Sequence, residues 1–256
     1  MSSSTAESGP STNAAHLMTS AVVFTIPVLK LAWTLGGGDA ARDALLAMGP
    51  ANWLDVVIGM FFAEPVLAFV LAAVACHFTY AYQAAHGGAA RHRDRAPAAT
   101  AAAAAILPAA AGIVVGAFNG LGWGLATGVL GYAMRLGVVT EYRTGGRSAE
   151  TGHRTGRPAT TLPTRAAAAI RIVAVVLATT VLPVLAVSAA LNGRSWTSVL
   201  HCDVNTGSGP QRARVVELDR SAPGVVGWDV PAHEVVSGTN CAVDPDDVIR
   251  PPWWRG

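Results

Sequence analysis

The chain has 256 residues, of which 52% are hydrophobic and 13% are charged, and its formal net charge is +2. A soluble globular domain carries about 25% charged residues, so this composition argues against an ordinary cytosolic enzyme and against a disordered chain. It predicts an α-helical polytopic membrane protein whose main surroundings are the lipid bilayer.

The N-terminal part of the chain predicts a tail followed by a first membrane helix. Residues 1–16 are rich in Ser and Thr and contain no Lys or Arg, which indicates a disordered cytoplasmic tail. A spanning helix needs about 20 mostly apolar residues, and residues 17–35 meet this need before a run of three glycines. We do not interpret this stretch as a cleaved signal peptide, because no basic segment precedes it and no small-residue cleavage site follows it.

Four further helices are expected between residues 53 and 191. The second is 53–76, and the last is 166–191. Between them lies a stretch from 98 to 134 without a charged side chain, which as one helix would be roughly 55 Å long, too long for a bilayer about 30 Å thick. The dipeptide Asn119-Gly120 favours a turn and predicts a hairpin of helices 100–118 and 121–138, with one long helix as the alternative.

The distribution of arginines predicts how these helices are threaded. Arginines gather in the loops 77–97 and 139–165, whereas loop 36–52 holds one arginine beside two aspartates. With five helices both basic loops fall on one side, which the positive-inside rule assigns to the cytoplasm. With four helices they fall on opposite sides. We therefore expect five helices, an N-terminus in the cytoplasm and a C-terminus outside it.

Two sets of residues inside the predicted spans are candidates for special roles. Gly112, Gly116, Gly124 and Gly128 have the spacing that lets membrane helices approach closely, although chance in a glycine-rich chain could produce the same pattern. Lys30 and Glu64 are ionisable residues within the first two spans, where such residues are rare. By depth, Lys30 could reach either Glu64 or Asp55. The pair either fixes two helices together or makes Glu64 a carboxylate that handles protons or ions.

Residues 192–256 have a different composition, which predicts a small extracytoplasmic β-rich module. Charged residues return, and short β-favouring runs alternate with turn-forming clusters. A disulfide between Cys202 and Cys241 would stabilise so small a core, and disulfides persist in oxidising compartments. The alternatives are two free thiols or a zinc site, but the zinc-binding spacings of Cys and His are missing. Trp253 and Trp254 would either reach the outer headgroups or cover the sheet.

These patterns predict a location more firmly than an activity. No nucleotide-binding, metalloprotease or serine-hydrolase motif occurs, so we expect no enzyme, no cofactor and no metal site. We favour a membrane-anchored accessory or interaction protein that uses its C-terminal module to bind a protein partner, or a second copy of itself. One alternative is a small transporter or channel subunit that uses Glu64 and Lys30. The other is a membrane component of DNA transfer or envelope assembly, although the arginine loops need no nucleic acid to explain them.

Overall fold

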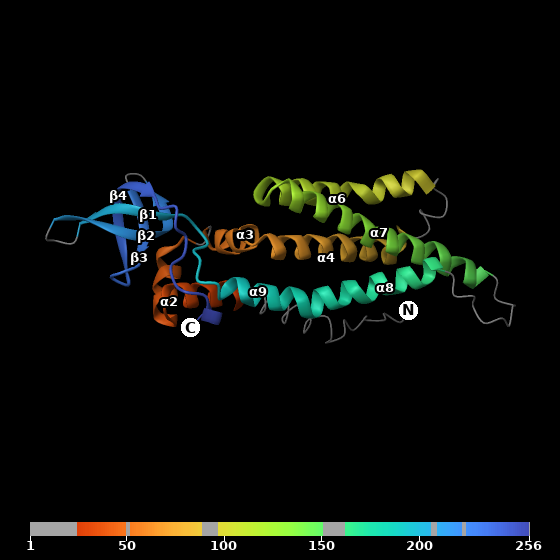
Figure 1. The fold of residues 1–256 in the computed structure, drawn as a ribbon, viewed down its shortest axis with the longest axis horizontal. Helices are drawn as coiled ribbons and strands as arrows, with labels where there is room; N and C mark the ends of the chain where they lie inside the picture. The colour runs from red at the N-terminus through yellow and green to blue at the C-terminus, as the bar shows by residue number, and fades with distance from the viewer. Residues whose placement is uncertain are drawn as a thin grey trace, which may run out of the picture. The chain divides into compact units, whose positions relative to one another are not determined.

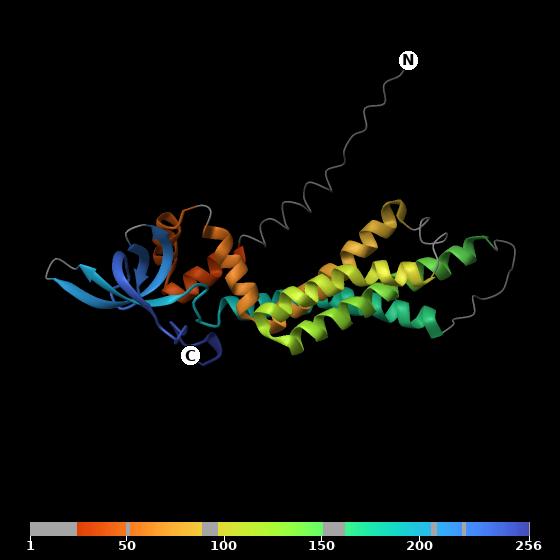
Figure 2. The same cartoon turned by 90° about the horizontal axis from the view of Figure 1, so that it is seen from above.

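The computed structural model describes residues 25–49, 52–88, 97–150, 162–205, 209–221 and 224–255 (Figures 1 and 2). The chain divides into two compact units, Phe61–Ala186 and the pair of segments Met1–Met60 and Val187–Gly256. We call the described residues of the first unit the helix bundle and those of the second the barrel module. The predicted tail 1–16 and the loop arginines at 91–95 and 154–157 lie outside the described residues.

The helix bundle consists of long apolar helices. The first is α4 (Pro65–Gln83), which continues as the π-helical segment η2 (Ala84–Gly88). It is followed by α6 (Pro97–Asn119) and α7 (Leu121–Glu150). The last is α8 (Leu162–Val176), which continues through the π-helical segment η3 (Leu177–Val181) into α9 (Leu182–Ala190). Within the described residues, three helices are long and apolar enough to cross a membrane: Pro65–His86, Ala98–Asn119 and Arg165–Ala190. The chain therefore has the features of a multi-pass membrane protein.

The long uncharged stretch forms two helices. α6 ends at Asn119 and α7 begins at Leu121, and the connecting Gly120 has a φ of 94°. A positive φ of this kind costs glycine little and strains other residues. The two helices pack side by side (Figure 1), and α7 also contacts α4 and α8.

The predicted helix 53–76 is replaced by two helices with a break between them. α3 (Trp53–Ala63) ends before Glu64, whose backbone is extended at φ −112° and ψ 97°, and α4 begins at Pro65. Proline at the first position of a helix lacks the N–H that would be unpaired there, and it disfavours helical geometry in the residue before it. The candidate span is accordingly shifted toward the C-terminus, to Pro65–His86.

The N-terminal segment also differs from its prediction. Its described part is an apolar helix, Thr25–Leu35, shorter than a span. The expected loop 36–52 contains a further helix, α2 (Gly38–Ala47), in which Ala41 and Ala44 are buried. Small apolar residues at this spacing form one buried face of a short helix. A search for long apolar runs does not detect such a helix.

The C-terminal sheet is a four-stranded antiparallel barrel. Its strands are β1 (Val199–Asn205), β2 (Pro210–Ser221), β3 (Gly224–Asp229) and β4 (Glu234–Val243). Each strand pairs with the next, and β1 also pairs with β4, so the sheet closes on itself. Buried side chains from alternate positions fill the interior, among them Leu200, Cys202, Val204, Val215 and Val225. The predicted β-rich region is thus confirmed as a closed sheet.

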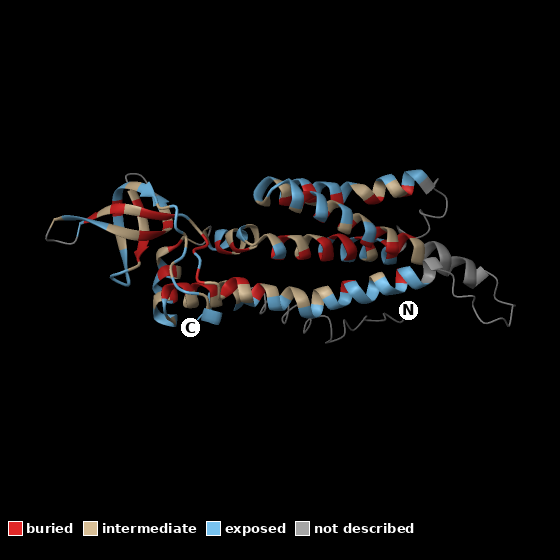
Figure 3. Ribbon diagram, in the orientation of Figure 1, coloured by how far each residue is buried: buried red, intermediate tan, exposed pale blue. Residues whose placement is uncertain are grey.

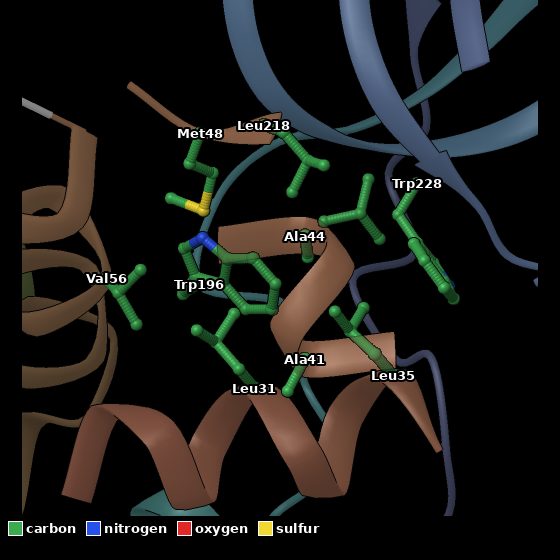
Figure 4. Close-up of a cluster of buried hydrophobic side chains, with 10 residues drawn as sticks. Leu31, Leu35, Ala41, Ala44, Met48, Val56, Trp196, Leu218 and Trp228 are labelled. Carbon is green, nitrogen blue, oxygen red and sulfur yellow. The ribbon is translucent and has the colours of Figure 1, made fainter. Parts of the chain in front are cut away.

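The outer face of the barrel shares a hydrophobic core with the N-terminal helices (Figure 4). Trp196 lies among Leu31, Met48 and Val56, and Leu35 is in the same cluster as Trp228. Strand β2 contributes side chains to both the barrel interior and the shared core, because Val215 belongs to the first and Val216 to the second. The sequence grouped residues 17–191 as one bundle, but the structure joins residues 25–60 to the barrel instead.

Candidate functional site

The disulfide between Cys202 and Cys241 connects β1 to β4, and both strands are hydrogen-bonded neighbours in the barrel. Gly238 makes room for it, because a Cβ at this position would lie 2.6 Å from the Cβ of Cys202. The predicted disulfide is confirmed. Since disulfides persist in oxidising compartments, it favours a location of the barrel outside the cytoplasm.

A group of partly exposed charged side chains surrounds Asp244 at the surface of the barrel. Arg214 donates a hydrogen bond from Nε to Asp244 Oδ2 at 2.7 Å, and His201 Nε2 lies 3.3 Å from the same oxygen. The backbone N–H of Asp246 donates to the other carboxylate oxygen at 3.0 Å. The Asp246 N–H first, and then Arg214, hold the pKa of Asp244 below its usual range. These contacts fix the chain just after β4.

A polar cleft of about 240 Å³ opens on the barrel module next to the shared core. Glu217 accepts two hydrogen bonds from the guanidinium of Arg220, at 2.9 and 3.1 Å. Asp219 accepts a hydrogen bond of 2.9 Å from the side-chain amide of Asn52. Asp55 is exposed and also lines this cleft. Glu217, Asp219 and Arg220 are therefore held in place, and the lining of the cleft carries more negative than positive charge.

The cleft is built by elements that are distant in the sequence. Asn52 directly precedes α3 and Asp55 lies in its first turn, whereas Glu217, Asp219 and Arg220 come from β2. The register of β2 against β3 shifts between Glu217 and Asp219, and such a bulge redirects side chains at the edge of a strand. No local motif marks this arrangement, so the sequence did not predict the cleft, and Asp55 entered the prediction only as a partner for Lys30.

Lys30 is buried in the barrel module, with 2% of its surface exposed. Its ammonium group donates to the carbonyl of Ala189 at 3.0 Å and to Oδ1 of Asn192 at 2.5 Å. These contacts connect the helix Thr25–Leu35 to the end of α9. Lys30 therefore joins the middle of its helix to the C-terminal end of α9 in this unit. Glu64 belongs to the helix bundle, and the pairing of Lys30 with Glu64 stays a prediction.

Glu64 lies directly before the first residue of α4. A carboxylate at this position interacts favourably with the partial positive charge of a helix N-terminus. The predicted helix 53–76 would have put Glu64 deep in the bilayer, whereas the observed candidate span begins one residue after it. Its position is thus accounted for by the start of the helix.

The helix bundle contains a buried cation that was not among the predicted site residues. Arg135 on α7 is 4% exposed and donates from Nε to the carbonyl of Cys76 and from Nη1 to the carbonyl of Ala104, both at 3.1 Å. Its guanidinium carbon also lies 4.7 Å from the ring centre of Tyr80. Arg135 therefore connects α7 to α4 and α6. The sequence does place this arginine inside the predicted helix 121–138. Because it lies only four residues before the basic loop 139–165, it was not singled out as a residue within the membrane.

The predicted glycines lie where α6 and α7 approach most closely. A Cβ at Gly124 would be 2.6 Å from the carbonyl oxygen of Gly112 and 2.7 Å from the Cα of Gly116. A Cβ at Gly112 would be 3.3 Å from the Cα of Gly128. Only residues without a side chain allow this distance between two helix backbones. The structure thus brings all four glycines to one helix contact.

Among the residues that the structure describes, no group of three or more His, Cys, Asp or Glu side chains is arranged to hold a metal ion. Comparisons of the chain with protein-family models, with curated proteins and with solved structures find no match.

Proposed function

We propose that this protein is a membrane-anchored accessory protein that presents its barrel module outside the cytoplasm to a protein partner. The observation that carries the proposal is the combination of a disulfide-linked barrel with helices apolar enough to cross a membrane. The barrel is joined through a hydrophobic core to helices that precede the bundle, so the chain enters and leaves the bundle from one folded unit.

This shared core supports an even number of membrane crossings between residues 56 and 196. Residues 31–56 and 196–228 contribute to one core, so they must lie on the same side of the membrane. The chain between them must then cross an even number of times. Three candidate spans alone would leave the two halves of the core on opposite sides. We therefore infer that α7, which packs along α6 and α4, is the fourth crossing. The expected first span, 17–35, stays a prediction, because residues 17–24 lie outside those that the structure describes.

The polar cleft is the surface that we assign to the partner. The side chains of Glu217, Asp219 and Arg220 are ordered by hydrogen bonds within the module, so little of their conformational entropy would be lost on binding. The excess of carboxylates favours a partner segment that carries Lys or Arg. Asp55 is the exposed carboxylate of the set and would contribute most directly.

The threading is tested by labelling single cysteines in intact cells with a membrane-impermeant thiol reagent. Leu46→Cys and Val243→Cys introduce thiols at sites that are 74% and 72% exposed in the barrel module. Both should react from outside, whereas Arg154→Cys should react only after lysis. The native disulfide does not react, and Cys76 is buried. Reaction of Leu46→Cys and Val243→Cys from opposite sides would overturn the proposed threading.

The partner surface is tested by a photo-crosslinking residue placed in the full-length protein. At Asp55 it should yield a discrete crosslinked protein, and the matched control is the exposed residue Gln211 on β2. Adding the charge reversal Glu217→Lys should reduce the crosslink from position 55. Equal crosslinking from both positions, or none from the cleft, would contradict the proposal.

A further inference from the structure

The C-terminal segment of the chain is fastened to the point where the last candidate span ends. That span ends at Ala190, and the backbone N–H of Trp253 donates to the carbonyl of the next residue, Leu191, at 3.1 Å. Two more backbone bonds join Ile249 and Arg250 to the carbonyl of Gly193. We call residues 247–255 the C-terminal strap.

The strap follows residues 191–195 closely. Ser195 N–H donates to the carbonyl of Asp247 at 2.8 Å, and Arg194 forms a β-bridge with Val248. Gly193 has a φ of 72°, and a Cβ on it would collide with the carbonyl of Arg250. The level of the strap relative to the end of the span is therefore set by the backbone and does not depend on flexible side chains.

Arg250 adds a second attachment. Its Nη1 donates to the carbonyl of Trp33 at 3.2 Å, and its guanidinium lies over the Trp33 ring at 5.0 Å from the ring centre. Trp33 is close to the end of the helix Thr25–Leu35. The strap is thus tied to the ends of two apolar helices that belong to the same unit.

Two large aromatic side chains project from this strap. Trp253 and Trp254 form the short helix η4 (Trp253–Arg255) and are 51% and 55% exposed. Their rings meet edge to face, with centres 6.1 Å apart. Side chains that covered the sheet would be buried against it, so the exposure of both rings favours the first of the two roles considered from the sequence. Tryptophan is enriched at the level of lipid headgroups, where its ring is apolar and its N–H finds polar partners.

We propose that Trp253 and Trp254 insert into the headgroup region of the outer leaflet and hold the C-terminal strap against the bilayer surface. The bound partner is the lipid surface itself. Arg255, which is exposed beside the pair, lies within reach of lipid phosphates at that level. This inference requires the last span to cross the membrane, but it does not depend on the protein partner proposed above.

The test measures tryptophan fluorescence of the full-length protein in phosphatidylcholine vesicles. Some vesicles contain lipids brominated near the headgroup end of the acyl chain, and others contain lipids brominated near its methyl end. The contribution of the pair is the difference between the native protein and the variant Trp253→Phe/Trp254→Phe. Trp228→Phe is the matched control, because Trp228 is 3% exposed in the core of the module.

Shallow bromine should reduce the fluorescence of the pair at least about twofold, and deep bromine should reduce it less. The contribution of Trp228 should be unaffected by either lipid. Quenching of the pair by aqueous iodide with no effect of brominated lipid would overturn the proposal, and it is the result expected of a surface that binds protein. Flotation of the vesicles, recorded first, shows whether the protein is inserted, and loss of insertion would overturn both proposals.

Discussion

The two units of this protein differ in which side chains they bury and which they expose. In the barrel module, large apolar side chains such as Trp196, Trp228 and Leu200 are buried, and most charged side chains other than Lys30 and Asp229 lie at the surface. In the helix bundle, Ile113, Leu125 and Val129 are more than 60% exposed, while glycines form the contact between α6 and α7. Figure 3 shows the long exposed faces of the bundle helices.

The difference indicates which solvent each unit faces. Burying large apolar groups stabilises a fold in water, because water is excluded from them. In lipid, this driving force between helices is absent, and close packing of small residues takes its place. The glycine contact of α6 with α7 and the outward-facing Ile and Leu side chains are what a lipid environment requires. The barrel module shows the pattern of a protein in water.

Both units nevertheless bury a cation in a similar way. Lys30 in the module and Arg135 in the bundle each donate hydrogen bonds to backbone carbonyl groups of neighbouring helices. Carbonyl groups near helix ends have free lone pairs and a partial negative charge. Ala189 lies at such an end, whereas Cys76 and Ala104 lie inside their helices. Lys30 therefore interacts favourably with a helix C-terminus, and Arg135 relies on the second lone pair of carbonyls already bonded within a helix.

Removing the disulfide is expected to cause the largest loss of stability, and this loss should be confined to the barrel module. Replacing both Cys202 and Cys241 by Ser opens a link between residues 39 apart, which should lower the stability of the barrel module by about 4 kcal/mol. Hydrogen exchange of the β-strands and of the bundle helices measures the two units separately. The strands should lose protection and the bundle should keep it. Cys76→Ser, in the bundle, is the control that should leave the strands unchanged, and equal loss in both units would show that they unfold together.

The shared core can be broken from the helical side. Leu35→Ala removes a side chain that is 2% exposed and should destabilise the barrel by about 3 kcal/mol, although Leu35 is far from the strands in sequence. Leu46→Ala is the matched control, since Leu46 is 74% exposed, and it should change stability by less than about 0.5 kcal/mol. Chemical denaturation followed by the fluorescence of Trp196 and Trp228 measures both. A barrel unaffected by Leu35→Ala would mean that it folds without the helices.

A smaller effect is expected at the glycine contact of the bundle. Gly124→Ala places a methyl group against the backbone of α6 and should cost about 1–3 kcal/mol, or separate the helices. Gly122→Ala is the matched control on the same helix. Its Cβ would meet nothing within 4 Å, and the better helix propensity of Ala should stabilise it by up to about 1 kcal/mol. Thermal unfolding in detergent compares the variants, and two equal responses would exclude close packing at Gly124.

The smallest effect is expected on the pH dependence of stability, and only in the barrel module. The folded state holds the pKa of Asp244 below its ordinary value, so the ionised form stabilises the fold. This contribution is fully present above the unfolded pKa, near 3.8, and is lost as pH falls through the lower folded pKa. Asp244→Asn should therefore make the module less stable at neutral pH and reduce the loss of stability on acidification. Denaturation curves across this pH range compare the variant with the native protein, and parallel curves would contradict the assignment.

The sequence by itself determined the class of the protein and most of its helices. Long, predominantly apolar stretches cannot be placed in water at low cost, so the predicted helices 100–118 and 166–191, which the candidate spans Ala98–Asn119 and Arg165–Ala190 match closely, follow from composition alone. The turn at Gly120 and the disulfide between Cys202 and Cys241 were also predictable, because glycine and paired cysteines have few alternative uses in such contexts. The β-rich character of residues 199–243 followed from short apolar runs between turns.

Only the tertiary structure decided how these parts are combined. Whether Leu31, Val56 and Trp196 form one core depends on contacts between residues more than a hundred positions apart, and no local pattern records such contacts. The same is true of the carbonyl partners of Arg135 and of the polar cleft between α3 and β2. Composition reports the solvent that a segment prefers, whereas the packing of one segment against another depends on the three-dimensional arrangement of the whole unit.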